Sequence, residues 1–178
     1  NLQARVWHDT TSLFRQAIRV DPRNIVAHIN LGLGLTKLGD LEAANAEYRA
    51  ALAISQRLGQ VNFFIGLNLY KMGRRTEALE AFQTEIALFP DNAAAQGAAG
   101  TTLLVLGRTT EAEPHLRAAL RIDPLQSDAR RGLGVIMLER GDVQGALYNL
   151  RIAVQANPAD QYAGRMLLRA EQQAQQGR

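Results

Sequence analysis

The chain has 178 residues, of which 47% are hydrophobic and 6% aromatic, so it can bury a sizeable core and fold as a globular protein. Its 20 Lys and Arg residues against 17 Asp and Glu residues give a net charge of +3, too small by itself to predict a nucleic-acid or anionic-membrane partner. The absence of cysteine excludes disulfides, thiolate metal sites and cysteine nucleophiles, and no unbroken apolar run reaches the roughly 20 residues of a membrane helix.

A spacing of 34 residues recurs along the chain in four independent columns of small or turn-forming residues. Four columns at one spacing are not expected by chance, and only the proline column has a gap, at Gln56. The columns are Pro22, Pro90, Pro124 and Pro158; Gly39, Gly73, Gly107 and Gly141; Gly32, Gly66, Gly100 and Gly134; and Ala44, Ala78, Ala112 and Ala146.

Each repeat is predicted to be a pair of helices. Segments such as 25–38 and 41–54 carry apolar residues at three- and four-residue spacing, which is typical of amphipathic helices. A glycine such as Gly39 ends the first helix in a left-handed conformation, and a proline such as Pro22 stops the preceding second helix. Asn24, Asn92 and Asp160 are predicted to cap the first helices that follow them.

The repeats fill the chain from end to end. Residues 1–24 are predicted to be the second half of a preceding repeat, because Phe14 and Ala17 align with Tyr48 and Ala51. Complete repeats follow at 25–58, 59–92, 93–126 and 127–160, and 161–178 is predicted to be a terminal helix with a polar face. We therefore expect residues 1–178 to form a single domain.

The glycines inside the first helices require an explanation, because each costs about 1 kcal/mol relative to alanine. We expect each to face the alanine of the second helix in its own repeat, as Gly32 would face Ala44, so that the two backbones approach closely. Larger residues such as Leu31 and Tyr48 would then fill the space around the crossing.

These columns resemble those of the tetratricopeptide repeat family, whose members consist of helical hairpins of this length with proline at their boundaries. The resemblance implies an all-α fold, namely a right-handed α-solenoid of stacked antiparallel helical hairpins, and a role as a protein–protein interaction scaffold. One departure is Glu85, which replaces the small residue found at Ala51, Ala119 and Ala153 and puts the local packing of 59–92 in question. Another is the early first-helix position that usually holds a large aromatic, which is occupied here by His28, Asn62, Gln96 and Arg130.

No catalytic or metal-binding pattern accompanies the repeats. The three histidines are far apart in the sequence and lack metal-ligand spacing, and no serine lies in a nucleophile elbow. Arg49, Arg117 and Arg151 recur at one position of the second helices, where a solvated outer face is preferred to a phosphate-binding ladder. We therefore expect a protein that is not an enzyme and has no metal, no cofactor and no nucleic-acid partner.

In the tetratricopeptide repeat family the first helices line the inner, concave wall, so the resemblance implies a partner-binding groove on their exposed faces. The residues expected there are mainly apolar and are edged by basic side chains: Ile29, Leu33, Lys37, Phe63, Leu67, Tyr70, Lys71, Thr101, Leu104, Arg131 and Val135. Such a surface favours a protein or peptide ligand, held as an amphipathic helix or an extended hydrophobic segment.

Two further features bear on this groove. Relatives that grip a C-terminal carboxylate use polar residues at positions where this chain has Leu33, Phe64 and two alanines, which disfavours that ligand. The alternative to a binding groove is that neighbouring turns, or a second copy of the protein, already cover Phe63 and Tyr70. Assembly into a homo-oligomer is therefore the alternative to partner binding.

The N-terminal residues carry a second resemblance. Arg5, Trp7 and Asp9 are similar to the Arg-x-Trp-x-Asp junction that leads from the last membrane helix into the repeat domain of multi-pass membrane glycosyltransferases of the O-mannosyltransferase type. This implies an extracytoplasmic or periplasmic acceptor-recognition domain of a membrane protein, attached upstream. Separately, the Arg-rich, Lys-poor composition favours a bacterial source. Trp7 equally fits a cap over the first hairpin, and a cytoplasmic location stays open.

Overall fold

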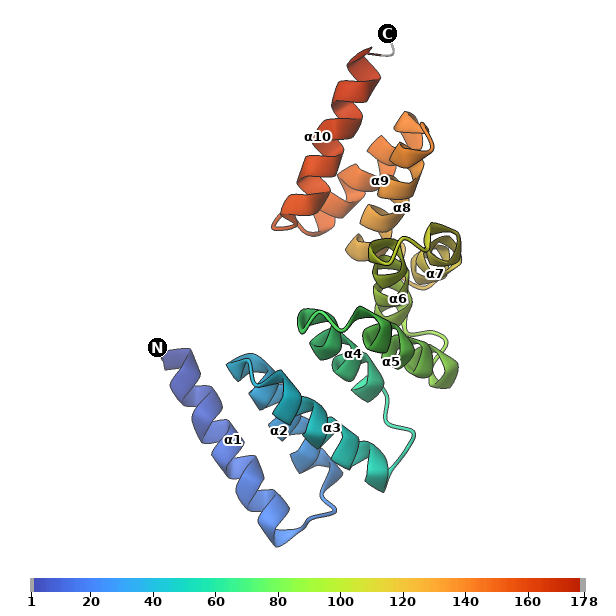
Figure 1. Cartoon of the computed structure of the whole chain (residues 1–178). Coiled ribbons are helices and arrows are strands. Elements are labelled where there is room, and N and C mark those ends of the chain that lie inside the picture. Colours follow the sequence, from blue (N-terminus) through green and yellow to red (C-terminus); the bar gives the residue numbers. More distant parts are fainter. Residues whose placement is uncertain (1, 177–178) are drawn as a thin grey trace. The chain divides into compact units, whose positions relative to one another are not determined.

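The computed structural model describes residues 2–176, with side chains from residue 10 onward. This described part consists of ten α-helices and contains no strand (Figure 1). The chain is therefore all-α, as predicted. The helices are α1 (Leu2–Val20), α2 (Ile25–Leu38), α3 (Leu41–Ile54), α4 (Val61–Lys71), α5 (Arg75–Leu88), α6 (Ala93–Val105), α7 (Thr109–Ile122), α8 (Ser127–Glu139), α9 (Val143–Ala156) and α10 (Gln161–Gln176).

The helices pack as hairpins within two compact units, Asn1–Phe89 (unit 1) and Pro90–Arg178 (unit 2). In unit 1, α2 pairs with α3 and α4 with α5, while α1 packs against α2 (Figure 1). In unit 2, α6 pairs with α7 and α8 with α9, while α10 packs against α9. The expectation of a single domain over 1–178 stays a prediction.

Each unit buries a stripe of large side chains between its paired helices. Tyr48 and Phe82 are at most 1% exposed in unit 1, and Leu116, Ile136 and Leu150 are at most 1% exposed in unit 2. These residues lie on the second helix of their pair, apart from Ile136 in α8. The apolar stripes that the sequence pattern predicts are therefore the ones that hold each hairpin together.

The turn glycines have the predicted conformation. The φ angle is 87° at Gly39 and 75° at Gly107, in the left-handed region that favours glycine. At the end of α2, the Gly39 amide donates to the Thr36 carbonyl and the Asp40 amide to the Leu35 carbonyl, at 3.2 and 3.0 Å. This pattern satisfies carbonyls that would otherwise lack a donor at the helix end.

The predicted caps are also confirmed. Asn24 Oδ1 accepts from the Ala27 amide at 2.9 Å, and Asn92 Oδ1 accepts from the Ala95 amide at 3.0 Å. Asp160 does the same at the start of α10. The helices α2, α6 and α10 therefore begin where the sequence predicts, because each starting polar side chain satisfies an amide of the first turn.

The glycines inside the first helices are covered most closely by a large side chain of the second helix. A Cβ placed on Gly32 would lie 2.5 Å from the ring of Tyr48, which covers the glycine. The alanine Ala44 is fully buried one turn earlier on the same helix. At Gly100 the backbone carbonyl oxygen of Ala112 would also lie 3.2 Å from an added Cβ, so the expected alanine borders that glycine beside the large residue. The large residues that cover the other three are Phe82 at Gly66, Leu116 at Gly100 and Leu150 at Gly134.

Polar residues at the usual aromatic position have a structural role. His28 contacts the Pro22 carbonyl through Nε2 and Glu47 of α3 through Nδ1, at 3.1 and 2.7 Å. The side chain thus joins the repeat boundary to the second helix. Gln96 and Arg130 make the equivalent two contacts, to Pro90 and His115 and to Pro124 and Asn149 respectively.

The repeat that lacks its boundary proline is held in another way. Glu85 of α5 is fully buried, and its Oε1 accepts a hydrogen bond from the Gln60 amide at 2.7 Å. Gln60 precedes α4 in a left-handed conformation, with a φ angle of 68°, and has no side-chain cap. Glu85 therefore takes over the capping of α4, which explains why a carboxylate stands where other repeats have alanine.

Candidate functional site

The predicted binding residues of unit 1 form one stripe on each first helix. Ile29, Leu33 and Lys37 follow one another at four-residue spacing on α2, and so do Phe63, Leu67 and Lys71 on α4, with Tyr70 beside them. Residues four apart lie on the same side of a helix. The apolar members are half-buried and the two lysines are exposed. These seven residues are called the first-helix face of unit 1.

Aromatic packing within unit 1 uses part of this face. The Phe63 ring lies 5.9 Å from the Phe82 ring of α5 and 5.9 Å from the Phe64 ring, measured between centroids. Phe64 in turn stacks on Tyr48 of α3 at 5.8 Å. Neighbouring helices therefore cover part of Phe63, while the remainder of its ring keeps some exposure to solvent.

The two lysines of the face carry charge that the described protein does not neutralise. Within residues 10–176, neither Lys37 nor Lys71 forms an ion pair or a side-chain hydrogen bond. Each lies in the last turn of its helix, where a positive charge interacts favourably with the helix dipole. The face therefore combines apolar surface with a basic edge.

A buried polar network supports the face from behind. Asn68 of α4 donates through Nδ2 to the Thr36 hydroxyl of α2 at 3.1 Å and to Asn45 Oδ1 of α3 at 3.0 Å. The Tyr48 hydroxyl lies 3.5 Å from that of Thr36. Burial raises the pKa of Tyr48, an effect that the hydrogen bond with Thr36 partly offsets. The network fixes α2 relative to α4.

Sequence reasoning missed the two buried asparagines of this network. Asn45 and Asn68 are 0% and 1% exposed, and the Nδ2 group of Asn45 has no acceptor among the described residues. A signal was present, since each asparagine interrupts the apolar stripe of its helix. Buried side-chain amides are retained only where partners satisfy most of their hydrogen bonds.

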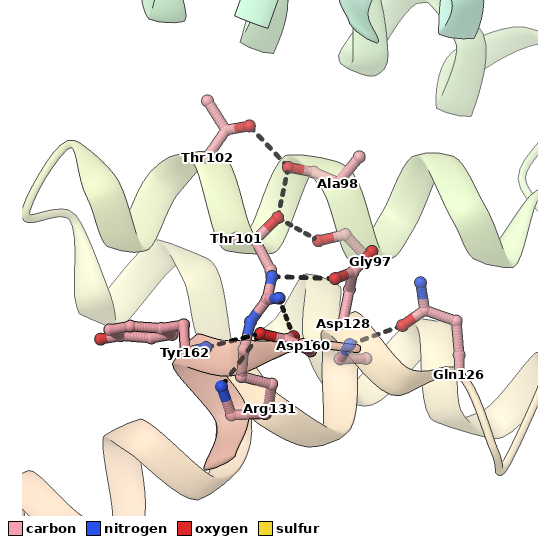
Figure 2. A network of polar contacts seen from close by, with 11 residues as sticks. Gly97, Ala98, Thr101, Thr102, Gln126, Asp128, Arg131, Asp160 and Tyr162 are labelled. Atoms are coloured by element: carbon pink, nitrogen blue, oxygen red, sulfur yellow. Dashed lines mark hydrogen bonds and ion pairs between the residues drawn. The ribbon is translucent and has the colours of Figure 1, made fainter. Parts of the chain in front are cut away.

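The predicted binding residues of unit 2 use their polar groups internally. The Thr101 hydroxyl donates to the Gly97 carbonyl at 3.0 Å, within its own helix. Arg131 pairs with Asp128 at 2.8 Å and also with Asp160, so two carboxylates neutralise its charge (Figure 2). The Arg131 side chain is therefore not available as the basic edge that the sequence suggested.

Asp160 is held firmly in this cluster. Burial by itself would raise its pKa, but the amide of Ala163 and the guanidinium of Arg131 hold the pKa of this carboxyl below its usual value. Figure 2 shows Arg131 between the carboxylates of Asp128 and Asp160.

The two remaining predicted binding residues of unit 2 are apolar. Leu104 packs toward Gly132 of α8, and Val135 is half-buried.

The described residues contain no group of three or more His, Cys, Asp and Glu side chains that could hold a metal ion. No helix in that part of the chain is both long and apolar enough to cross a membrane. The side chains of Arg5, Trp7 and Asp9, which carry the resemblance to a membrane glycosyltransferase junction, lie outside the described residues.

Comparison with known proteins identifies the family and the fold of the chain. The family model described as "Tetratricopeptide repeat" matches residues 65–127 and 98–161, which together span more than half of the chain. A search of curated proteins found no match. Many solved structures share the fold at low sequence identity.

Three solved structures illustrate the likeness. PilF of Pseudomonas aeruginosa has a TM-score of 0.83 at 20% identity, with 96% of this chain and 78% of that chain covered. MamA has a TM-score of 0.73 at 18% identity, covering 83% and 86% of the two chains. YrrB, described as a repeat protein of this kind with an unusual peptide-binding site, has a TM-score of 0.71 at 21% identity, covering 92% and 84%. At these identities the likeness shows the fold, an all-α solenoid.

Proposed function

The chain belongs to the tetratricopeptide repeat family, whose members act as protein-interaction scaffolds, and from this premise we propose that the first-helix face of unit 1 binds a peptide or helix of a partner protein. The observation that carries the proposal is the contrast between the two units. Lys37 and Lys71 have no acidic partner among the described residues, whereas Arg131 of unit 2 is already paired with two carboxylates. The role is one of recognition, without catalysis.

The chemistry of the face defines the partner. Its half-buried apolar side chains, such as Leu67 and Tyr70, favour apolar side chains of a ligand, since removing apolar surface from water contributes about 25 cal/mol per Å² before ordering costs. The basic edge favours a nearby Asp or Glu on the same ligand. An amphipathic acidic helix meets both requirements, and so does an extended segment with alternating apolar and acidic residues.

Two features support this proposal. The network around Asn68 fixes α2 against α4, so the face is formed before a partner arrives and little ordering cost is expected. The fold is also shared with YrrB, a protein described as having a peptide-binding site. Peptide recognition is therefore compatible with this architecture.

Site-specific photocrosslinking in cells tests the proposal. Benzoylphenylalanine at Tyr70, a similar ring, should capture one partner in high yield. The control places the same group at Arg49, an exposed residue on α3 of the same unit. Equal capture at both positions would show that the face is not the site. Capture of a second copy of the protein would show that the face serves self-assembly and not binding of a different partner.

A further inference from the structure

A cleft of about 410 Å³ lies in unit 2 among α7, α8 and α9. Arg117, Arg121 and Arg130 line it together with Leu120, Leu133 and Met137. This cleft lies on a different stripe of α8 from the predicted binding residues Arg131 and Val135. We propose that the cleft is a second binding site, which accepts an acidic side chain and an adjacent apolar side chain of a peptide.

The positive charge of the cleft is not balanced by carboxylates in its lining. Arg121 forms no ion pair or side-chain hydrogen bond with any described residue. Arg130 donates only to neutral acceptors, the Pro124 carbonyl at 2.9 Å and Asn149 Oδ1 at 3.0 Å. Arg117 pairs with Glu113 at 2.7 Å, but Glu113 also pairs with Arg140 at 2.8 Å. The cleft therefore attracts an oxyanion.

One arginine of the cleft, Arg130, is held in place before any ligand binds. Asn149, which accepts from Arg130, is 4% exposed and is itself fixed by donating to the Gly145 carbonyl at 2.9 Å. The Arg130 guanidinium also lies over the Tyr148 ring, 5.4 Å from its centroid. Three of the five N–H groups of the guanidinium are left after its two hydrogen bonds. A ligand carboxylate would thus meet an oriented donor, which lowers the ordering cost of binding.

The remaining walls decide the class of ligand. Leu120, Leu133 and Met137 give the cleft an apolar side that a bare inorganic ion would leave unused. The volume is at the lower end of the roughly 300–1,000 Å³ that ligand pockets occupy, which suits one or two side chains. No aromatic residue is in the lining, so a stacked nucleotide base has no platform. An acidic residue next to an apolar one fits these walls.

Methyl NMR of the methionines tests the proposal, because only Met137 of the three lies in the cleft. The probe is a capped hexapeptide of alternating glutamate and leucine, titrated into the full chain with ¹³C-methyl methionine. We expect the Met137 signal to shift and saturate, and Arg121→Glu to raise the half-saturating concentration about tenfold or more. Arg151→Glu, which changes an exposed arginine one repeat after Arg117, should leave that concentration unchanged.

Other outcomes of the NMR titration distinguish this cleft from other binding sites and other ligands. A Met137 signal that does not move would overturn the proposal. So would a loss of binding in Arg151→Glu as large as that in Arg121→Glu. A shift of Met72 alone would place the peptide on unit 1, and would overturn the second site while leaving the proposed function intact. If inorganic phosphate moves Met137 at the same concentration as the peptide, the cleft is a simple anion site. If a glutamate and serine hexapeptide binds as tightly, the apolar wall has no role.

Discussion

The side-chain amide of Asn68 in α4 donates a hydrogen bond to the hydroxyl of Thr36 in α2, 3.1 Å away, and so joins the first helices of two consecutive repeats. The same amide donates to Asn45 of α3. Because Asn68 is 1% exposed, solvent does not compete for these hydrogen bonds in the folded protein. The face that we propose for partner binding therefore depends on a polar contact in the interior.

Asn68→Ala is expected to lower the free energy of unfolding by about 1–3 kcal/mol, because the buried Asn45 and the half-buried Thr36 lose their donor. Urea denaturation followed by circular dichroism measures this change. The control is Asn30→Ala, whose side chain bonds, among the described residues, to the Val26 carbonyl one turn earlier and which should change stability by about 0.5 kcal/mol or less. Equal effects of the two substitutions would show that the network adds nothing.

Two glycine substitutions compare a packed helix crossing at Gly32 with an open helix position at Gly164, and they are expected to change stability in opposite directions. Gly32→Ala places a Cβ 2.5 Å from the buried Tyr48 ring and should cost about 1–3 kcal/mol. Gly164→Ala in α10 meets no atom within 4 Å and should stabilise by about 0.5–1 kcal/mol, as alanine favours the helix. Thermal unfolding gives both values. A Gly32→Ala protein as stable as the parent would mean that Tyr48 can move aside.

The turn after α6 provides a test of backbone conformation alone. Gly107 has a φ angle of 75° and open space around it, so Gly107→Ala should cost about 1–2 kcal/mol through the backbone and not through contacts. Gly107→Asn should cost less, since asparagine adopts this conformation more readily than alanine. Denaturant midpoints of the two variants show which substitution loses more stability. A smaller loss in Gly107→Ala than in Gly107→Asn would contradict the left-handed turn.

Stability should fall on mild acidification because of His115. Burial lowers the pKa of His115, which Glu111 only partly counteracts, and Nδ1 contacts Gln96 Oε1 at 2.8 Å. The unfolded chain, with an ordinary histidine pKa near 6.5, therefore binds the proton first as the pH decreases. The stability contribution is complete above that value and is lost as the pH falls through the folded pKa.

His115→Gln removes this titration while keeping an amide donor toward Gln96. Chemical denaturation at pH 7.5 and at pH 5.5 should show a smaller loss of stability in the variant than in the parent (both pH values are about one unit from the ordinary histidine pKa). A parent protein whose loss over this interval equals that of the variant would rule out His115 as the source.

The sequence was sufficient to predict the repeats, their turns and their caps, because each depends on residues close together in the chain. Gly39 needs only its own backbone angle, and Asn24 bonds an amide three residues away. The period did not determine which residue covers Gly32. Ala44 and Tyr48 are four residues apart on one helix, so they share a face and satisfy the pattern equally.

The candidate site was harder to predict because its charges depend on contacts that are distant in sequence. Arg131 and Asp160 are brought together by the start of α10, and nothing in the local pattern around Arg131 indicates that partner. Lys37 and Lys71 are exposed, and only the structure shows that they differ from Arg131 in having no acidic partner within the described residues. The polar roles of His28 and Gln96 likewise required the second helix to be in place.

Calorimetric titration of the partner segment captured at Tyr70 tests the central claim most directly, by comparing Leu67→Glu with Val135→Glu. The two residues occupy the same repeat position, are both half-buried, and lie in unit 1 and unit 2 respectively. Recognition by the first-helix face of unit 1 predicts that Leu67→Glu abolishes binding without unfolding the protein, while Val135→Glu binds like the parent. Loss of binding in Val135→Glu with normal binding in Leu67→Glu would contradict it.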